Sequence, residues 1–179
     1  MAVFFVSDTH FGHANVIGYC GRPYADVGAM NADLIRRWND RVQPGDTVYH
    51  LGDFAMGPRD NIGDYRRRLQ GRIVLVRGNH DRSVSAMLAA GFDEVHNSLT
   101  IDCHGHRVFM RHIPPVDDAH PGKKYREHFL QPPPDNYDYW LCGHVHQRWV
   151  ARGPYVINVG VDVWDYTPRT LDELVRYQL

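Results

Sequence analysis

An apolar run followed within three residues by aspartate, asparagine or histidine occurs five times in this chain. The runs lie at residues 2–6, 47–51, 73–76, 107–110 and 137–142. Short apolar runs of this length are typical of buried strands. In an open α/β sheet the carboxyl ends of parallel strands share one edge, and ligands bind there. The pattern therefore predicts that five polar clusters, far apart in sequence, line one rim of a sheet.

The segments between and after these runs predict helices. Met30, Leu34, Trp38 and Val42 recur every four residues, which predicts an amphipathic helix over residues 26–41. Further helices are predicted over 59–69, from an N-cap at Ser83 to Ala89, and from a capping box at 170–173 to about 177. Strands that alternate with helices predict an α/β fold with crossover helices.

The second half of the chain predicts two pairs of adjacent strands. Residues 95–101 and 107–110 flank a turn, so we expect His104 and His106 in an exposed hairpin loop rather than at a metal. Residues 148–151 and 155–159 predict two more strands. The proline-rich segment 114–134 has little periodicity, and we expect a long functional or flexible loop there.

The totals limit what kind of protein this can be. A length of 179 residues predicts one domain over 1–179, and a net charge of −1 excludes a general basic field for nucleic-acid binding. The three cysteines have neither Cys-x-x-Cys spacing nor a disulfide framework, which indicates a reducing compartment. Neither a leader peptide nor a membrane span is apparent. We therefore expect a cytoplasmic protein without a membrane partner and without an obligate protein partner.

The polar clusters contain residue types that bind metal ions. Seven side chains are candidate ligands: Asp8, His10, Asp53, Asn79, His112, His144 and His146. Seven ligands exceed what one ion needs, but two divalent ions about 3.5–4 Å apart with a bridging carboxylate would use them. The mixture of oxygen and imidazole ligands suits manganese, iron or zinc better than magnesium or calcium. His80, in the turn formed by residues 78–81, is left over as a free acid or base.

The same residues resemble a known family. The ordered set Asp8-x-His10, Gly52-Asp53, Gly78-Asn79-His80-Asp81, His112 and Gly143-His144-x-His146 is similar to the motifs of the calcineurin-like metallophosphoesterases. The resemblance implies two packed mixed β-sheets flanked by helices, in four αββα layers. It also implies two divalent ions, with manganese expected and iron, zinc or nickel as alternatives. Asp8, His10, Asp53 and His146 would hold the first ion; Asp53, Asn79, His112 and His144 would hold the second.

This ligand set predicts phosphate-ester hydrolysis. Metal coordination lowers the pKa of a bound water, so hydroxide becomes available for attack, with Asp53 bridging the ions and His80 protonating the leaving oxygen. Asp81 is expected to support the turn. His13, Arg22 and Asn79 are candidate substrate contacts, although His13 could equally lie at the surface and Arg22 could be a solvated charge. Trp140, Trp164 and Tyr166 could stack on a base, but core packing is the commoner role.

Three functions are compatible with these residues. The first is a phosphodiesterase, because a chain near the minimum for this fold, without a cap domain, should leave the metals open to a bulky diester such as a nucleotide or nucleic-acid end. The second is a phosphomonoesterase acting on small phosphorylated molecules or nucleotides. The third is a binding scaffold that has lost catalysis, which the free His80 argues against. We expect the phosphodiesterase.

Overall fold

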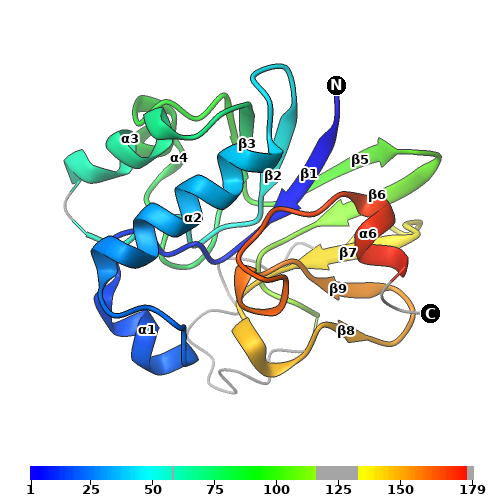
Figure 1. The fold of residues 1–179 in the computed structure, drawn as a ribbon. Helices are drawn as coiled ribbons and strands as arrows, with labels where there is room; N and C mark the ends of the chain where they lie inside the picture. The colour runs from blue at the N-terminus through cyan, green and yellow to red at the C-terminus, as the bar shows by residue number, and fades with distance from the viewer. Residues whose placement is uncertain (58, 116–132, 177–179) are drawn as a thin grey trace.

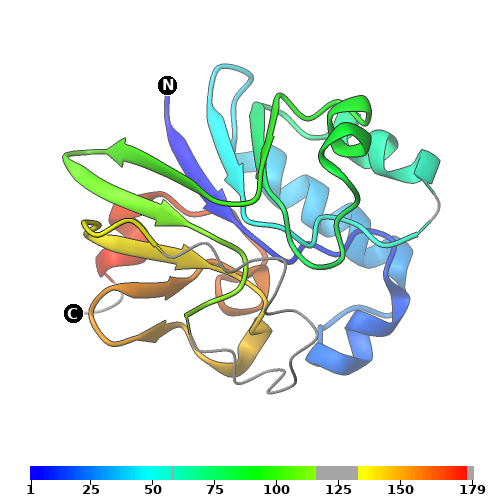
Figure 2. The ribbon, with the colours of Figure 1, turned by 180° about the vertical axis from the view of Figure 1, so that it is seen from behind.

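Two β-sheets pack face to face in the computed structural model, which describes residues 1–57, 59–115 and 133–176 (Figures 1 and 2). The first sheet has the order β1-β2-β3-β4, and all of its pairs are parallel. Its strands are β1 (Val3–Val6), β2 (Thr47–His50), β3 (Arg72–Val76) and β4 (Glu94–His96). The predicted class, an α/β fold with two packed sheets and flanking helices, is confirmed, although the first sheet is parallel rather than mixed.

The second sheet is mixed, with the order β5-β6-β7-β9-β8. Strands β6, β7 and β9 run parallel, whereas β5 and β8 pair antiparallel at the two edges. Its strands are β5 (Leu99–Cys103), β6 (His106–Met110), β7 (Tyr139–Cys142), β8 (Ala151–Arg152) and β9 (Val156–Asn158). The carboxyl ends of β6 and β7 therefore point the same way as each other and can present their polar residues together.

Helices α2, α3 and α4 cover the outer face of the first sheet. The described helices are α1 (Ala14–Cys20), α2 (Val27–Arg41), α3 (Arg59–Arg68), α4 (Val84–Ala89) and α6 (Leu171–Arg176). Asp26 caps α2 by accepting the backbone N–H of Ala29, and the helix buries Met30, Leu34 and Trp38, as their spacing predicts. The predicted N-cap at Ser83 and the capping box at Thr170 and Glu173 are also confirmed.

Alternate residues of the strands serve two separate cores. Phe4 and Val6 of β1 face the helices, whereas Phe5 faces the second sheet, where it packs in one cluster with Met110 and Leu141. Both faces of the first sheet are thus buried, which explains why its strands are continuously apolar in sequence. The second of these cores fixes the first sheet against the second, and the ends of β1 and β7 point toward the middle of the molecule (Figure 1).

The structure corrects three predicted elements. The predicted strand 95–101 is two strands: β4 ends at His96 in the first sheet, and β5 begins at Leu99 in the second. Helix α1 was not expected; its N-cap residue, His13, makes no capping hydrogen bond, so the sequence carries little start signal. The strand predicted over 148–151 begins only at Ala151, as β8, because residue 148 ends a 3-10 helix over His146–Arg148.

Two further predictions fall partly on residues that the structure does not describe. Most of the predicted loop 114–134 lies outside the described residues, as does the end of the last helix near residue 177. Within the described ranges, no helix combines the length and apolar character required to cross a bilayer.

Candidate active site

Backbone pairing between β1 and β2 continues past the strands into the two motifs that follow them. The backbone N–H of Asp8 donates to the carbonyl of Gly52, at 3.0 Å, and that of His10 donates to the carbonyl of Asp53, also at 3.0 Å. The N–H of Phe11 extends the ladder to the carbonyl of Phe54. The first two predicted clusters therefore lie side by side because their backbones are hydrogen-bonded, as at adjacent parallel strand ends.

Many of the candidate ligands have a left-handed backbone. Five non-glycine residues among them have φ between 48° and 72°: Asp8, His10, Asp53, His144 and His146. This region is uncommon for residues with a Cβ and tends to cluster at functional sites. These φ values change the local direction of the chain. The side chains of residues two apart, such as Asp8 and His10, therefore face the same group of candidate ligands.

Two glycines allow the carboxylates to approach the backbone closely. A Cβ placed on Gly78 would overlap the Oδ1 atom of Asp53, and one placed on Gly143 would overlap the side chains of Ser7 and Asp8. Neither glycine has a left-handed φ that would by itself require glycine. Their role is therefore space: the third and fifth motifs pack directly on the aspartates of the first two.

The first ligand group comprises Asp8, His10 and His146, whose ligand atoms all lie within 4.8 Å of one another. The Nε2 atom of His10 is 3.9 Å from Asp8 Oδ1, and the Nε2 atom of His146 is 4.0 Å from the same oxygen. The two imidazole rings stack with centroids 5.2 Å apart. His10 is buried, and neither of its ring nitrogens has a hydrogen-bond partner. A buried imidazole without a partner needs a ligand such as a metal ion.

The second group comprises Asp53, His112 and His144, again within 4.8 Å. His112 Nδ1 is 2.6 Å from the carbonyl oxygen of Leu51, so this nitrogen carries the proton and donates it. Its Nε2 then faces Asp53 Oδ2, at 3.3 Å. The Oδ1 atom of Asn79 lies 3.1 Å from His112 Nε2 and 3.0 Å from His144 Nδ1, which places a neutral oxygen in the same group.

Asp53 lies between the two groups. Its Oδ2 atom is 3.6 Å from His10 Nε2 and 3.3 Å from His112 Nε2, while its Oδ1 accepts the backbone N–H of His80 at 2.9 Å. The Asp53 pKa reflects these partners. Burial raises it, but the charge and hydrogen bond of His112 outweigh burial and hold this pKa far below its usual range. Asp53 is therefore ionised and able to face a cation on either side.

The candidate ligands are aspartates, an asparagine and histidines, so their cluster carries positive charge only when its histidines are protonated. Burial raises the pKa of Asp8, and the nearby Asp53 raises it further. Burial lowers the pKa of His112, but the Asp53 charge outweighs it and raises this pKa to about 9. Burial, together with the nearby His146, Arg22 and His80, keeps the pKa of His10 well below its usual value although Asp53 raises it, so its ring is neutral. Buried carboxylates and neutral imidazoles are ligands that divalent transition metals prefer, so the residues fit two such ions.

His80 lies at the open side of this cluster. Its side chain is 41% exposed, and its Nε2 atom is 3.9 Å from Asp53 Oδ2. It belongs to neither ligand group. His13 is partly exposed beside it, with its ring centroid 5.6 Å from that of His10, and burial lowers its pKa. Both side chains therefore border the cluster of candidate ligands.

Asp81 supports the turn that carries His80. Its carboxylate is buried and accepts three backbone N–H groups: those of Asp53 at 2.8 Å, Phe54 at 3.0 Å and Gly78 at 2.8 Å. These bonds join the Gly52-Asp53 motif to the turn over residues 78–81. Asp81 thus takes the supporting position that we predicted for it.

Arg22 is not placed as a substrate contact. Its side chain is fully buried and forms an ion pair with Asp162 at 2.8 Å, and it also donates to the carbonyls of Asp8 and Thr9. The prediction that Arg22 binds substrate is therefore corrected: the guanidinium lies beneath the first ligand group. The three aromatic residues that could have stacked on a base pack internally, with Trp140 and Trp164 buried and Tyr166 against Tyr24.

Two residues of the site escaped the sequence analysis. Asp162 Oδ2 is 2.7 Å from His146 Nδ1. His50 contacts Thr9, in the first motif, and Gly52, in the second. The Gly52 N–H donates to His50 Nδ1 at 3.2 Å, so His50 Nε2 carries the proton and donates it to Thr9 Oγ1, at 3.0 Å. The only signals in the sequence are that His50 lies in the second apolar run and that Asp162 closely follows the predicted strand 155–159.

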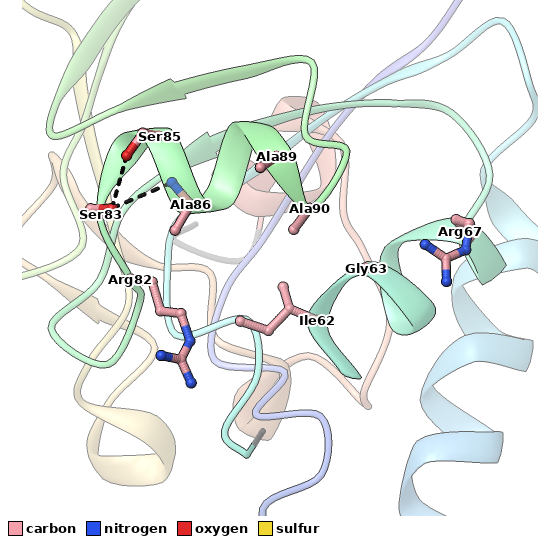
Figure 3. Close-up of a pocket in the computed structure, with 9 residues that line it drawn as sticks. All are labelled: Ile62, Gly63, Arg67, Arg82, Ser83, Ser85, Ala86, Ala89 and Ala90. Atoms are coloured by element: carbon pink, nitrogen blue, oxygen red, sulfur yellow. Dashed lines mark hydrogen bonds between the residues drawn. The ribbon is translucent and has the colours of Figure 1, made fainter. Parts of the chain in front are cut away.

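A separate hollow of about 470 Å³ lies between α3 and α4 (Figure 3). Small side chains such as Ala86 and Ala90 line it together with Arg67 and Arg82. It contains none of the candidate ligands. The guanidinium of Arg82 donates to the carbonyl of Gly57, which ties the end of the Asp81 turn to the loop after Asp53. The hollow is therefore distinct from the cluster of candidate ligands.

Comparison with known proteins identifies the family. Residues 1–170 match the model of the calcineurin-like phosphoesterase superfamily domain. The chain belongs to this superfamily, and it is a hydrolase that acts on phosphate esters. Family membership implies divalent metal ions, in agreement with the two groups of candidate ligands. The predicted resemblance is thus confirmed over nearly the whole chain.

Similar proteins span the same length. An uncharacterized protein of Methanocaldococcus jannaschii is 33% identical over 97% of this chain and 89% of its own length. The Gene 66 protein of Mycobacterium phage D29 is 30% identical, covering 96% and 93%. Among solved structures, a protein of unknown function from Aquifex aeolicus is 30% identical, covers 98% of both chains and has a TM-score of 0.75. An archaeal phosphodiesterase with 15% identity and a TM-score of 0.50 shares the fold, covering 96% and 99%.

The close approach at Gly78 leads to a prediction. Gly78→Ala should displace the Asp53 carboxylate and lower the bound metal below the wild-type content, measured by elemental analysis after loading with manganese. Gly18→Ala is the matched control, because a Cβ at this α1 position meets nothing within 4 Å. That variant should bind metal as the wild type does and gain about 0.5–1 kcal/mol of stability. Wild-type metal content in Gly78→Ala would contradict the packing argument.

Burial of His50 predicts a pH effect on stability. Burial lowers its pKa from 6.5 to about 3, so between these values the unfolded chain binds a proton that the folded protein excludes. This contribution to stability is complete above pH 6.5 and is lost as the pH falls toward 3. Between pH 7 and pH 5, the metal-free wild type should lose about 2 kcal/mol more than His50→Gln. Urea titrations at both pH values measure the difference, and equal losses would contradict it.

Proposed function

We propose that this protein is a dinuclear metal-dependent phosphoesterase that hydrolyses phosphodiesters. One observation carries the proposal: a single oxygen, Asp53 Oδ2, lies between an imidazole of each ligand group, at 3.6 Å from His10 and 3.3 Å from His112. A shared carboxylate is what two ions about 3.5–4 Å apart require. Because Asp53 is buried and ionised, it is available to both.

The proposed ligands divide into two sets that share Asp53. Asp8, His10, Asp53 and His146 hold the first ion, and Asp53, Asn79, His112 and His144 hold the second. Manganese is the proposed metal because the sets mix carboxylate, amide and imidazole ligands, and iron, zinc and nickel are alternatives. When bound, the two ions supply a water of lowered pKa and positive charge that faces the phosphoryl oxygens.

His80 is the proposed general acid. It lies next to Asp53, is 41% exposed and belongs to neither ligand group, so its imidazole is free to hold a proton for the departing oxygen. Asp53 contributes by fixing the backbone of this residue, because its Oδ1 accepts the His80 N–H. Asn79 Nδ2 and the His13 ring are proposed to contact the substrate phosphate from the same side.

The placement of Arg22 favours a diester. A phosphomonoester carries a second negative charge that an additional cationic side chain would stabilise, and Arg22 was the expected candidate. Its guanidinium is instead neutralised by Asp162 beneath the site. A diester carries one negative charge, which the metal ions alone can balance. Esters of nucleotides or of a nucleic-acid end are the proposed substrate class.

Substrate ranking tests the diester preference. The manganese-loaded protein should release nitrophenol from bis(nitrophenyl) phosphate with a higher kcat/KM than from nitrophenyl phosphate. Protein treated with a chelator should lose both activities and regain them when manganese is restored. The opposite ranking of the two esters would overturn the diester preference while leaving the metal site intact.

Removal of the proposed acid gives a second test. His80→Ala should retain both ions but lower kcat by about 10²–10⁴-fold on an ester with an alkyl leaving group. The loss should be much smaller with nitrophenol, which leaves without protonation. His104→Ala is the matched control, because this exposed hairpin histidine is outside the cluster. Full activity of His80→Ala on the alkyl ester would remove His80 from the mechanism.

A further inference from the structure

Asp162 is a buried carboxylate that contacts one of the proposed ligands. It lies in a short 3-10 helix, Val161–Val163, and its side chain is 1% exposed. Its Oδ2 atom is 2.7 Å from His146 Nδ1. Arg22 holds the same carboxylate on its other side, with Nε donating to Oδ1 at 2.8 Å and Nη2 donating to Oδ2 at 3.0 Å. The carboxylate is therefore fixed from both directions.

This contact determines which nitrogen of His146 is available to a metal ion. An ionised carboxylate only accepts hydrogen bonds, so the hydrogen between it and His146 must reside on Nδ1. The opposite nitrogen, Nε2, then keeps its lone pair when the ring is neutral, and it lies 4.0 Å from Asp8 Oδ1. The ring is also held in plane by stacking on His10. Asp162 thus orients His146 toward the first ligand group.

The ion pair reaches a second ligand through the backbone. Arg22 Nη2 donates to the carbonyl of Asp8 at 2.7 Å, and Nη1 donates to the carbonyl of Thr9 at 3.0 Å. Asp8 is one of the residues with a left-handed φ. One buried pair of side chains therefore holds the backbone of Asp8 and the ring of His146, which come from opposite ends of the chain.

We propose that Asp162 is a positioning residue that holds His146 with Nδ1 protonated and Nε2 directed at the first metal ion, and that Arg22 fixes Asp162 in that role. The inference rests on the proposed two-metal site, because it concerns one ligand of the first ion. A carboxylate behind a metal-bound histidine fixes its ring orientation, and its removal typically weakens metal binding about 10–100-fold.

Cys20 offers a competing use of the same residues. Its thiol lies with His146 and Asp162 in a group whose ligand atoms are within 4.8 Å of one another, a set that suits a thiophilic cation. Arg22 opposes this use, because its guanidinium donates to both carboxylate oxygens and would repel a second cation there. Cys20→Ala should therefore leave the binding of both ions unchanged.

Metal binding by Asp162→Asn tests the proposal. The amide has one acceptor oxygen, which Arg22 occupies, so its NH₂ group faces His146 Nδ1 and forces the ring proton onto Nε2. One manganese ion should bind about 10–100-fold more weakly than in the wild type, and the other should be unaffected. Equilibrium dialysis with elemental analysis measures both. Asp33→Asn is the control, because Asp33 accepts from Arg36, Arg37 and Tyr24 but contacts no proposed ligand.

Nuclear magnetic resonance of the wild type gives an answer even if Asp162→Asn does not fold. In the zinc-loaded protein, the ¹⁵N signals of His146 should show a protonated Nδ1 and a metal-bound Nε2. A metal-bound Nδ1 would overturn the proposal, as would wild-type affinity for both ions in a folded Asp162→Asn variant. If the wild type itself binds fewer than two ions, the proposed two-metal function is wrong. That result differs from a metal-bound Nδ1 and from wild-type affinity in Asp162→Asn, each of which contradicts only the role of Asp162.

Discussion

The left-handed backbone at five of the candidate ligands is the constraint on which the site depends. Each such residue costs of the order of 1–3 kcal/mol, so the surrounding structure must impose the conformation. The hydrogen-bonded ladder from Asp8 to Gly52 and from His10 to Asp53 imposes it on the first two motifs. Arg22 adds two bonds to the carbonyls of Asp8 and Thr9. The rigid sheets thus hold a geometry that an isolated loop would not keep.

Buried carboxylates in this fold fall into two kinds. Asp81 accepts three backbone N–H groups, and Asp162 is matched by Arg22, so each has its negative charge compensated by fixed protein groups. Asp8 and Asp53 are buried as deeply, but their carboxylates face imidazoles. Burial of an uncompensated carboxylate is costly. Asp8 and Asp53, which face imidazoles, are the two that a metal ion would serve.

The sequence predicts the sheets and the clusters better than it predicts their connections. The four-residue spacing from Met30 to Trp38 predicts α2, and the polar residues after the apolar runs do meet in one cluster. The crossing at residues 97 and 98 was missed although Asn97 and Ser98 are turn-type residues, because β-prone residues flank them on both sides. Pairing of the two flanks in different sheets is a tertiary effect. Arg22 was misplaced for a similar reason: only the fold brings Asp162, 140 positions later, against it.

The passage from β4 to β5 divides the chain into two halves that each supply part of the site. The first sheet provides Asp8, His10 and Asp53, and the second provides His112, His144 and His146. The backbone N–H of His144 reaches the carboxylate of Asp8 across 136 residues of sequence. Contacts this far apart in sequence require closure of a long loop, which has an entropic cost. The complete set of candidate ligands is therefore assembled only when the two sheets are docked, and a metal ion held by ligands from both sheets would link one half of the chain to the other.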